Sequence, residues 1–367
     1  MPAIRREAAR SLDRARPSSI TPPPSILVRT VNGLEELTAA GLAREGHRVL
    51  AASKRQFVVE PRDDSILTDP PRTADDVFPI VASIPDPGRS RQCLDPLSTA
   101  LARADLTAGV RMLRARDLRR NVVFSATASL TGRRNYSRHD LEDAVGRVLA
   151  RRLGAAYHSR RGGIAPPPEA IDWRVTADGT LVRVGLRASG TPLHRRAWRR
   201  ATVAGSIHPP VAAAMAELAR LEPGLRVLDP CCGAGTILIE AAHAEPDGAY
   251  VGGDHDADAV RIATGNADGH PGIVWRVGDA VSLPDASGSI DRIISNPPWG
   301  VQVHERHGLP HLLSEWRRVL RDDGLLVVLV DEGQEPALAG SRHWDVVRTL
   351  PLSVAGRHPR IVVARPS

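Results

Sequence analysis

Four residues with distinctive chemistry, Asn296, Pro297, Pro298 and Trp299, come after Ser295 and an apolar run at 290–294 that is predicted to be a buried strand. Proline fixes φ and has no N–H, so the backbone there cannot extend a sheet ladder and its carbonyls remain available as acceptors. The asparagine adds a side-chain acceptor and the tryptophan a flat apolar face. Two acceptors beside an aromatic ring suit a planar exocyclic amine, as on a nucleobase. The alternative is a proline-rich loop that closes a strand over a buried tryptophan.

A glycine-rich turn follows the strand predicted at 225–230. It begins at Asp229 and includes Gly233 and Gly235, which allow backbone and ligand to approach closely before the next helix begins. The turn lacks the Gly-Lys-Ser/Thr ending of a phosphate-binding P-loop. Leu238 stands where a dinucleotide fingerprint has its third glycine, so neither phosphate motif is complete.

Two further carboxylates follow predicted strands. Asp254 ends the strand at 250–254, where it could accept both hydroxyls of a ribose. Asp279 follows the strand at 273–277 and could accept from an adenine amine, with the backbone N–H of Ala280 as donor. Each of these residues alone could equally be a helix cap or a solvated turn. Four such motifs at successive strand ends favour a common site, because ligands of parallel sheets bind at the carboxyl ends of the strands.

The predicted elements that carry these motifs form an α/β domain from residue 206 to 367. Strands alternate with helices, which predicts a mostly parallel, doubly wound sheet of seven strands. Segments 344–351 and 360–364 read as a closing hairpin, which predicts one antiparallel strand. The whole chain divides into five predicted segments: a disordered basic and proline-rich extension (1–24), a ferredoxin-like module (25–94), a second α+β unit (95–190), a basic linker (191–205) and this domain (206–367).

The first half of the chain is predicted to be α+β throughout. A helix is expected over 34–45, another is expected to begin at 74–77, and a third is expected over 96–118. Ser137 is a good N-cap for a helix over 140–153.

Charge and composition separate the two halves. Of the 49 Lys and Arg and 42 Asp and Glu, residues 1–204 hold 35 basic and 21 acidic side chains, and residues 205–367 hold 14 and 21. A strongly basic half beside an acidic half suggests that one half meets a polyanion, although GC-rich coding also produces an arginine bias. Three cysteines, two of them adjacent, form neither a disulfide framework nor a metal-ligand spacing. No apolar stretch approaches the roughly 18 residues of a membrane span, so the expectation is a cytoplasmic protein without a metal site.

These motifs resemble those of class I S-adenosyl-L-methionine-dependent methyltransferases with an Asn-Pro-Pro-aromatic motif of the amino-methylating kind, over about residues 206–367. The resemblance implies a Rossmann-like fold, and it implies that Asn296 and the Pro297 carbonyl hold the target amine next to Pro298, with Trp299 stacked on its base. Trp299 replaces the more common tyrosine. The residues it implies at the cofactor are Asp229, Pro230, Cys231, Gly233, Gly235, Thr236, Asp254, His255, Asp279, Ala280 and Asn296.

DNA adenine or cytosine methyltransferases and release-factor glutamine methyltransferases share the same motif. Residues 121–153, however, resemble a THUMP RNA-binding domain, and Ser206 to Pro209 resemble the link into the catalytic domain of THUMP methyltransferases. The combination is similar to guanine-N2 methyltransferases that act on the tRNA acceptor stem, and ribosomal RNA guanine-N2 enzymes share it. A catalytically idle RNA-binding protein is the alternative from another class. We expect a monomer that contacts RNA through Arg133, Arg134, Arg195, Arg196, Arg199 and Arg200.

Overall fold

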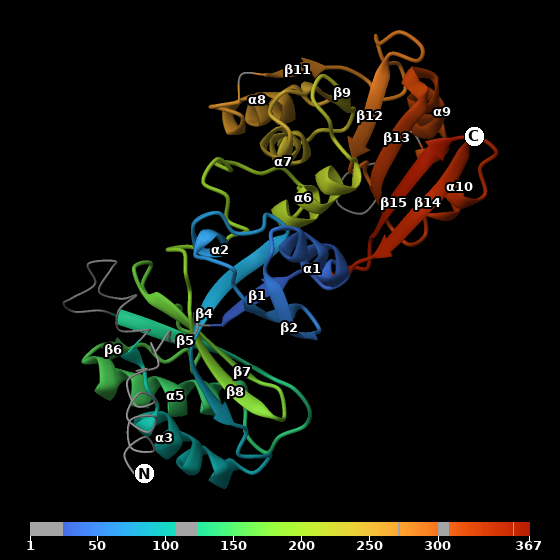
Figure 1. Ribbon diagram of the computed structural model, residues 1–367. Coiled ribbons are helices and arrows are strands. Elements are labelled where there is room, and N and C mark those ends of the chain that lie inside the picture. Colours follow the sequence, from blue (N-terminus) through green and yellow to red (C-terminus); the bar gives the residue numbers. More distant parts are fainter. Residues whose placement is uncertain (1–24, 108–122, 271, 300–307, 355) are drawn as a thin grey trace, which may run out of the picture.

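The computed structural model describes residues 25–107, 123–270, 272–299, 308–354 and 356–367. The predicted extension at 1–24 and the last part of the helix predicted over 96–118 lie outside these residues. Figure 1 shows two sheets, each with its own helices, that are joined by the segment between β8 and α6.

An eight-stranded sheet forms the first half, in the order β2-β3-β1-β4-β8-β7-β5-β6. Its strands are β1 (Ile26–Thr30), β2 (Arg48–Ser53), β3 (Gln56–Glu60), β4 (Ala74–Pro85), β5 (Val123–Leu130), β6 (Ala156–Tyr157), β7 (Ile171–Ala177) and β8 (Leu181–Leu186). β4 pairs with β1 along its first part and with β8 along its second part. The sheet is therefore continuous across the boundary near residue 94 that separates the two predicted α+β units.

The prediction that a helix begins at 74–77 is wrong, because these residues open β4. Ala74, Val77 and Phe78 are buried. Pairing with β1 on a buried face outweighs the weak helical preference of the acidic residues between them.

Helices cover this sheet: α1 (Glu35–Arg44), α2 (Ser65–Thr68), a 3-10 turn η1 (Arg91–Cys93), α3 (Leu94–Arg103) and α5 (Arg138–Leu153). The predicted cap of α5 is confirmed, because Ser137 and Asp140 form a reciprocal capping box and Gly154 ends the helix in the left-handed region. α5 packs its apolar face, which includes Leu141 and Val148, on the buried Trp173 of β7.

The second half contains a seven-stranded sheet in the order β11-β10-β9-β12-β13-β15-β14. Its strands are β9 (Arg226–Asp229), β10 (Ala249–Asp254), β11 (Ile273–Val277), β12 (Ile290–Ser295), β13 (Leu320–Val330), β14 (Trp344–Pro351) and β15 (Arg360–Pro366). Pairing is parallel from β11 to β13, and β15 is antiparallel to both β13 and β14. The predicted mostly parallel sheet with a closing hairpin is confirmed.

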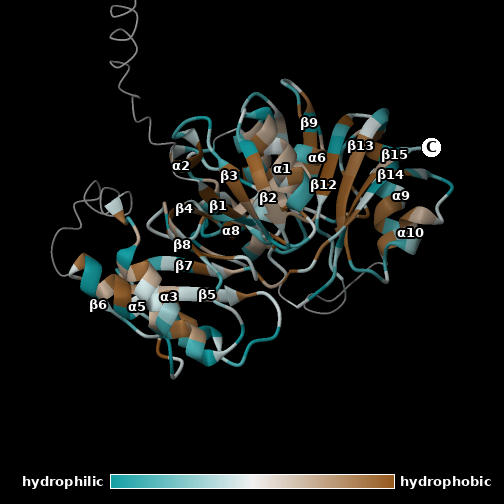
Figure 2. Cartoon of the chain, turned by 60° about the horizontal axis from the view of Figure 1, so that its bottom comes forward, coloured by the Kyte–Doolittle hydropathy of each residue, from teal (hydrophilic) through white to brown (hydrophobic). Residues whose placement is uncertain are grey.

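Apolar layers cover both faces of this sheet, as parallel sheets require. The helices are α6 (Pro209–Leu218), α7 (Thr236–Ala244), α8 (Ala257–Asn266), α9 (Leu309–Val319) and α10 (Pro336–Ala339). Alternate strand residues divide between the two layers: Val227, Ile294 and Val327 share a cluster with α6 and α7, and Leu228, Ile293 and Leu326 share one with α9. Figure 2 shows hydrophobic residues concentrated along β13, in the middle of the sheet. No helix in the described part of the chain is both long and apolar enough to cross a membrane.

The two halves share a core and a buried ionic cluster. Leu34 and Leu37 belong to the same apolar cluster as α6 and α7. Glu240 of α7 has no exposed surface in its side chain, and it accepts from Arg72 Nε of the first half at 2.6 Å and from Arg196 Nε of the linker at 2.8 Å. A carboxylate buried to this degree requires its cationic partners, so the three side chains hold the two halves together.

We therefore predict that Glu240→Ala lowers the free energy of unfolding by about 3–5 kcal/mol, because it leaves the guanidinium of Arg196 buried without its counter-charge. Urea denaturation measures the loss. The matched control is Glu36→Ala, since Glu36 is exposed and lies 3.8 Å from Arg348, and it should cost at most about 1 kcal/mol. Equal and small losses in both variants would contradict the structural role of Glu240.

Candidate functional site

A cavity of about 680 Å³ opens at the carboxyl ends of β9, β10 and β12. Ten of the eleven predicted cofactor residues line it: Asp229, Pro230, Cys231, Gly233, Thr236, Asp254, His255, Asp279, Ala280 and Asn296. Pro297, Pro298 and Trp299 line the same cavity. The four motifs that follow separate strands in the sequence therefore meet in one place.

The glycine turn between β9 and α7 is fixed by the end of β10. Gly233 N–H donates to Asp254 Oδ2 at 2.9 Å, and Asp256 N–H donates to Asp254 Oδ1 at 3.0 Å. Gly235 is not among the described residues that line the cavity. Its φ is +80°, and a Cβ there would lie 2.7 Å from the ring of Trp275. Gly235 thus permits close packing of the turn on β11. It does not line the cavity in which a ligand would bind.

Asp229 ends β9 with its carboxyl group fully buried. Oδ1 accepts from the Ser295 hydroxyl at 2.7 Å and from Cys231 N–H at 3.1 Å. Oδ2 is equally shielded, and no described residue donates to it. Burial raises the pKa of Asp229 to about 7. A buried carboxylate oxygen of this kind, at a cavity wall, suits a cationic or N–H group on a ligand.

A second shielded polar atom lies at the start of α7. Thr236 Oγ1 has no hydrogen-bond partner within the described part of the chain. It sits at the first residue of the helix, where N–H groups and the helix dipole favour a negative group. An unsatisfied acceptor at Asp229 and a donor-rich end at Thr236 together match the ammonium and carboxylate of an amino acid.

Asp254 and Asp279 also line the cavity, at neighbouring strand ends. Asp254 closes β10, and its Oδ1 lies 3.4 Å from His255 Nδ1. Asp279 Oδ1 accepts from Val281 N–H at 3.1 Å, which shapes the turn after β11. Because β10 and β11 pair in parallel, their carboxyl ends lie side by side, and one ligand in this cavity could contact both carboxylates.

Residues 296–299, which follow β12, are held by hydrogen bonds to three other segments. Asn296 Nδ2 donates to the Gly205 carbonyl at 3.1 Å. Trp299 Nε1 donates to the Leu329 carbonyl at 3.2 Å, and Gln334 Nε2 donates to the Pro298 carbonyl at 3.3 Å. The guanidinium of Arg357 lies 5.9 Å from the centre of the Trp299 ring, so a cation covers part of the surface that was predicted to stack on a base.

Asn296 Oδ1 is an unsatisfied hydrogen-bond acceptor. It is screened from solvent, and none of the residues that the structure describes donates a hydrogen bond to it. The hydrogen bond from Nδ2 to the Gly205 carbonyl fixes the orientation of the amide and leaves Oδ1 without a partner among the described residues. An acceptor held in this way is ready for an N–H donor that enters the cavity.

The six predicted RNA-contacting arginines fall into three groups by exposure. Arg133, Arg195 and Arg200 are exposed, although Arg200 pairs with Asp268 at 2.8 Å. Arg134 and Arg196 are not available for contact with RNA, because their side chains are only 3% and 9% exposed. Arg134 forms a two-pronged ion pair with Asp86, and Arg196 pairs with Glu240.

The expectation that Arg134 and Arg196 contact RNA is therefore corrected. Each is buried in an ion pair with a carboxylate, which is a structural role. Arg199 is half-buried and lines the cavity.

Sequence reasoning missed the contribution of the linker to the cavity. Residues 203–208 line it, and so does Arg357 from the turn between β14 and β15. Asn266 ties the linker down, since its Oδ1 accepts from the N–H groups of Arg200 and Ala201 and its Nδ2 donates to the Ala234 carbonyl of the glycine turn. No motif in the sequence marks residues 203–208 or Arg357 as part of the cavity, because contacts between distant segments bring them together.

Known proteins show the same fold and sequence pattern. Residues 196–350 match the RMKL-like methyltransferase domain. A tRNA (guanine(6)-N2)-methyltransferase from Thermus thermophilus is 33% identical over 242 residues, which cover 65% of this chain and 68% of that protein. The U6 snRNA (guanine-N(2))-methyltransferase THUMPD2 of Bos taurus is 34% identical over 178 residues, which cover 48% of this chain and only 34% of the relative.

The solved structure of TrmN from Thermus thermophilus covers 94% of this chain and 99% of its own, with a TM-score of 0.74 and 28% identity. The likeness thus extends over both sheets and their junction. These matches confirm the resemblance stated from the sequence. The chain belongs to the methyltransferase family that includes the Thermus thermophilus tRNA (guanine(6)-N2)-methyltransferase.

Proposed function

We propose that this methyltransferase transfers a methyl group from S-adenosyl-L-methionine to the exocyclic N2 amine of a guanine in RNA, with the tRNA acceptor stem as the expected target. The observation that carries the proposal is the pair of unsatisfied acceptors, Asn296 Oδ1 and Asp229 Oδ2, on two residues that line one cavity. One acceptor suits the amine that receives the methyl group, and the other suits the amino acid part of the donor.

The cavity wall supplies a group for each part of the cofactor. Asp229 Oδ2 would accept from the ammonium group, and Thr236 with the start of α7 would meet the carboxylate. Asp254 would accept from the ribose hydroxyls, and Asp279 with the N–H of Ala280 would meet the adenine. When bound, the cofactor supplies an electrophilic sulfonium methyl group.

The clamp after β12 would position the nucleophile. Asn296 Oδ1 and the Pro297 carbonyl accept the two hydrogens of the amine, which directs its lone pair toward the cofactor end of the cavity. The same oxygens stabilise the positive charge that grows on nitrogen as the new bond forms. The amine proton becomes acidic at that point and would pass to solvent water, so a strong general base is not required. A guanine within a stem must leave its stack to reach this clamp.

The basic first half supports an RNA substrate. Arg133 and Arg195 are exposed, on the sheet half and on the linker respectively, and arginine suits phosphate contact. The relatives named above act on tRNA and on U6 snRNA. We place the protein in the cytoplasm as a monomer, where tRNA is available to it; ribosomal RNA is the alternative substrate.

The first test of this function is Asn296→Ala. The variant should lower kcat by about 10²–10³-fold, as the loss of one oriented hydrogen-bonding group at a reacting centre does, and should still bind S-adenosyl-L-methionine. Methyl incorporation into RNA and calorimetric binding measure the two effects. Gln92→Ala, an exposed amide in the first half, is the control and should behave as wild type. Near-normal turnover in Asn296→Ala would reject the clamp.

The second test uses pH. The raised pKa of Asp229, about 7, means that the empty site holds a neutral carboxyl group below that pH. Because the ammonium group pairs with the ionised form, affinity for S-adenosyl-L-methionine should increase as pH rises from 5.5 to 7.5, by up to about tenfold per unit below the pKa.

Asp229→Asn should flatten this profile. 5′-Methylthioadenosine, which lacks the amino acid part, is the matched ligand control, and its affinity should not follow pH in the wild-type protein. An equal pH dependence for both ligands would contradict the assignment of Asp229 to the ammonium group.

The third test concerns the linker. Arg195→Glu should weaken RNA binding and lower the slope of log K against log salt by about one. Arg321→Glu is the charge-matched control, because Arg321 lies near the start of β13, at the edge of the sheet opposite the cavity. Filter binding at several salt concentrations measures both, and the same slope in all three proteins would remove the linker from the RNA contact surface.

A further inference from the structure

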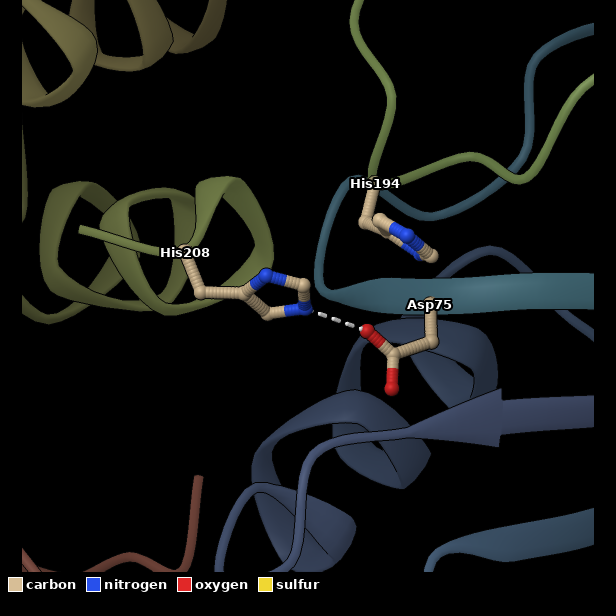
Figure 3. Close-up of side chains that lie close together, drawn as sticks. All are labelled: Asp75, His194 and His208. Atoms are coloured by element: carbon tan, nitrogen blue, oxygen red, sulfur yellow. Dashed lines mark hydrogen bonds and ion pairs between the residues drawn. The ribbon is translucent and has the colours of Figure 1, made fainter. Parts of the chain in front are cut away.

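Three side chains with metal-binding chemistry meet where the two halves of the molecule join. Asp75 lies at the start of β4, His194 lies in the linker, and His208 is the N-cap residue of α6. Figure 3 shows the His208 ring directed at the carboxylate of Asp75, and the His194 ring next to the same side chain. One ligating atom from each residue lies within 4.8 Å of the other two.

The distances within this junction cluster (Asp75, His194 and His208) are short for three groups so far apart in sequence. His208 Nε2 lies 2.7 Å from Asp75 Oδ1. The rings of His194 and His208 have centroids 5.1 Å apart. Two imidazoles and one carboxylate in such proximity form a donor set typical of zinc and related divalent transition metals.

His194 provides an independent indication of a missing partner. Its Nδ1 is screened from solvent, and no hydrogen-bond partner for it exists among the residues that the structure describes. A shielded imidazole nitrogen without a hydrogen-bond partner can donate its lone pair to a metal ion.

We infer that the junction cluster binds one divalent transition metal ion, with Zn²⁺ as the expected ion, through Asp75, His194 and His208. Three protein ligands leave a fourth position for water. Binding replaces the hydrogen bond between His208 Nε2 and Asp75 Oδ1, and the His208 ring then carries its hydrogen on Nδ1. This inference departs from the sequence-based expectation of no metal site, which considered only cysteine spacing.

Positive charge near the cluster limits the geometry. Arg55 Nη2 lies 3.6 Å from Asp75 Oδ2, so the ion would occupy the Oδ1 side, toward the two rings. Arg55 is half-exposed, and its charge is therefore partly screened by water.

The position of the site indicates a structural role for the ion. It joins the first sheet, the linker and the catalytic domain at one point, and His208 also lines the cofactor cavity. An ion there would fix the orientation of the RNA-binding half relative to the cavity, beside the ionic cluster of Glu240. The inference does not depend on the proposed substrate, and its test needs no measurement of methyl transfer.

The test uses the full chain without a histidine tag, stripped with EDTA and dialysed. Titration with ZnCl₂ by calorimetry, with metal content measured by mass spectrometry, should give one Zn²⁺ per chain and a saturating rise in Tm. Asp75→Asn and His194→Ala should each reduce the affinity by at least about tenfold. The wild-type titration stands by itself if a variant fails to fold.

His311→Ala and His243→Ala are the controls. His311 is exposed on α9, and His243 faces His270 with ring centroids 4.4 Å apart, the other close histidine pair in the described structure. Both variants should retain one Zn²⁺ per chain. Absence of stoichiometric binding in wild type would overturn the inference, as would loss of the ion in His243→Ala with retention in His194→Ala.

Discussion

One constrained amide, the side chain of Asn296, is central to the function that we propose. Asn296 stands at the carboxyl end of a parallel strand, and its Nδ2 donates to the Gly205 carbonyl, whereas its Oδ1 is screened from solvent and has no donor among the described residues. Two prolines follow and stiffen the backbone. Leaving a shielded acceptor unsatisfied costs free energy, and the arrangement makes sense where a substrate N–H completes the hydrogen bond.

The amide is also the end of a chain of contacts that runs through the linker. Arg196 anchors the linker to Glu240 of α7, and Asn266 holds it at Arg200 and Ala201. Gly205 then reaches Asn296. The segment that carries exposed Arg195 is thus tied to Asn296, the residue that we propose positions the amine. In that proposal, the same segment would couple the placement of RNA to the geometry of the clamp.

The sequence was informative wherever a local pattern determines the structure. Alternation of apolar strands and helices predicted the parallel sheet, because a right-handed crossover leaves few other arrangements. The positions of Asp229, Asp254 and Asp279 at strand ends predicted that they would share one site, because parallel strands end at the same edge of a sheet. The start of β4 at Ala74 was missed, because its strand character comes from pairing with β1 rather than from its own residues.

Side-chain tasks that depend on distant partners could not be predicted in this way. Arg134 and Arg196 look like RNA contacts in a basic sequence, but Asp86 and Glu240 lie in segments whose proximity only the fold reveals. Gly235 looks like a ligand contact, although Trp275 of β11 is the neighbour that requires a glycine there. The junction cluster of Asp75, His194 and His208 is hidden for the same reason.

Chemical identification of the methylated base tests the central claim most directly. The protein would be incubated with total tRNA and ribosomal RNA and with S-adenosyl-L-methionine carrying a labelled methyl group, and the labelled nucleosides would then be separated and identified. The account predicts that the label appears as N2-methylguanosine in RNA, with tRNA as the expected carrier. Label in N6-methyladenosine or another nucleoside, or no label in either RNA, would contradict it.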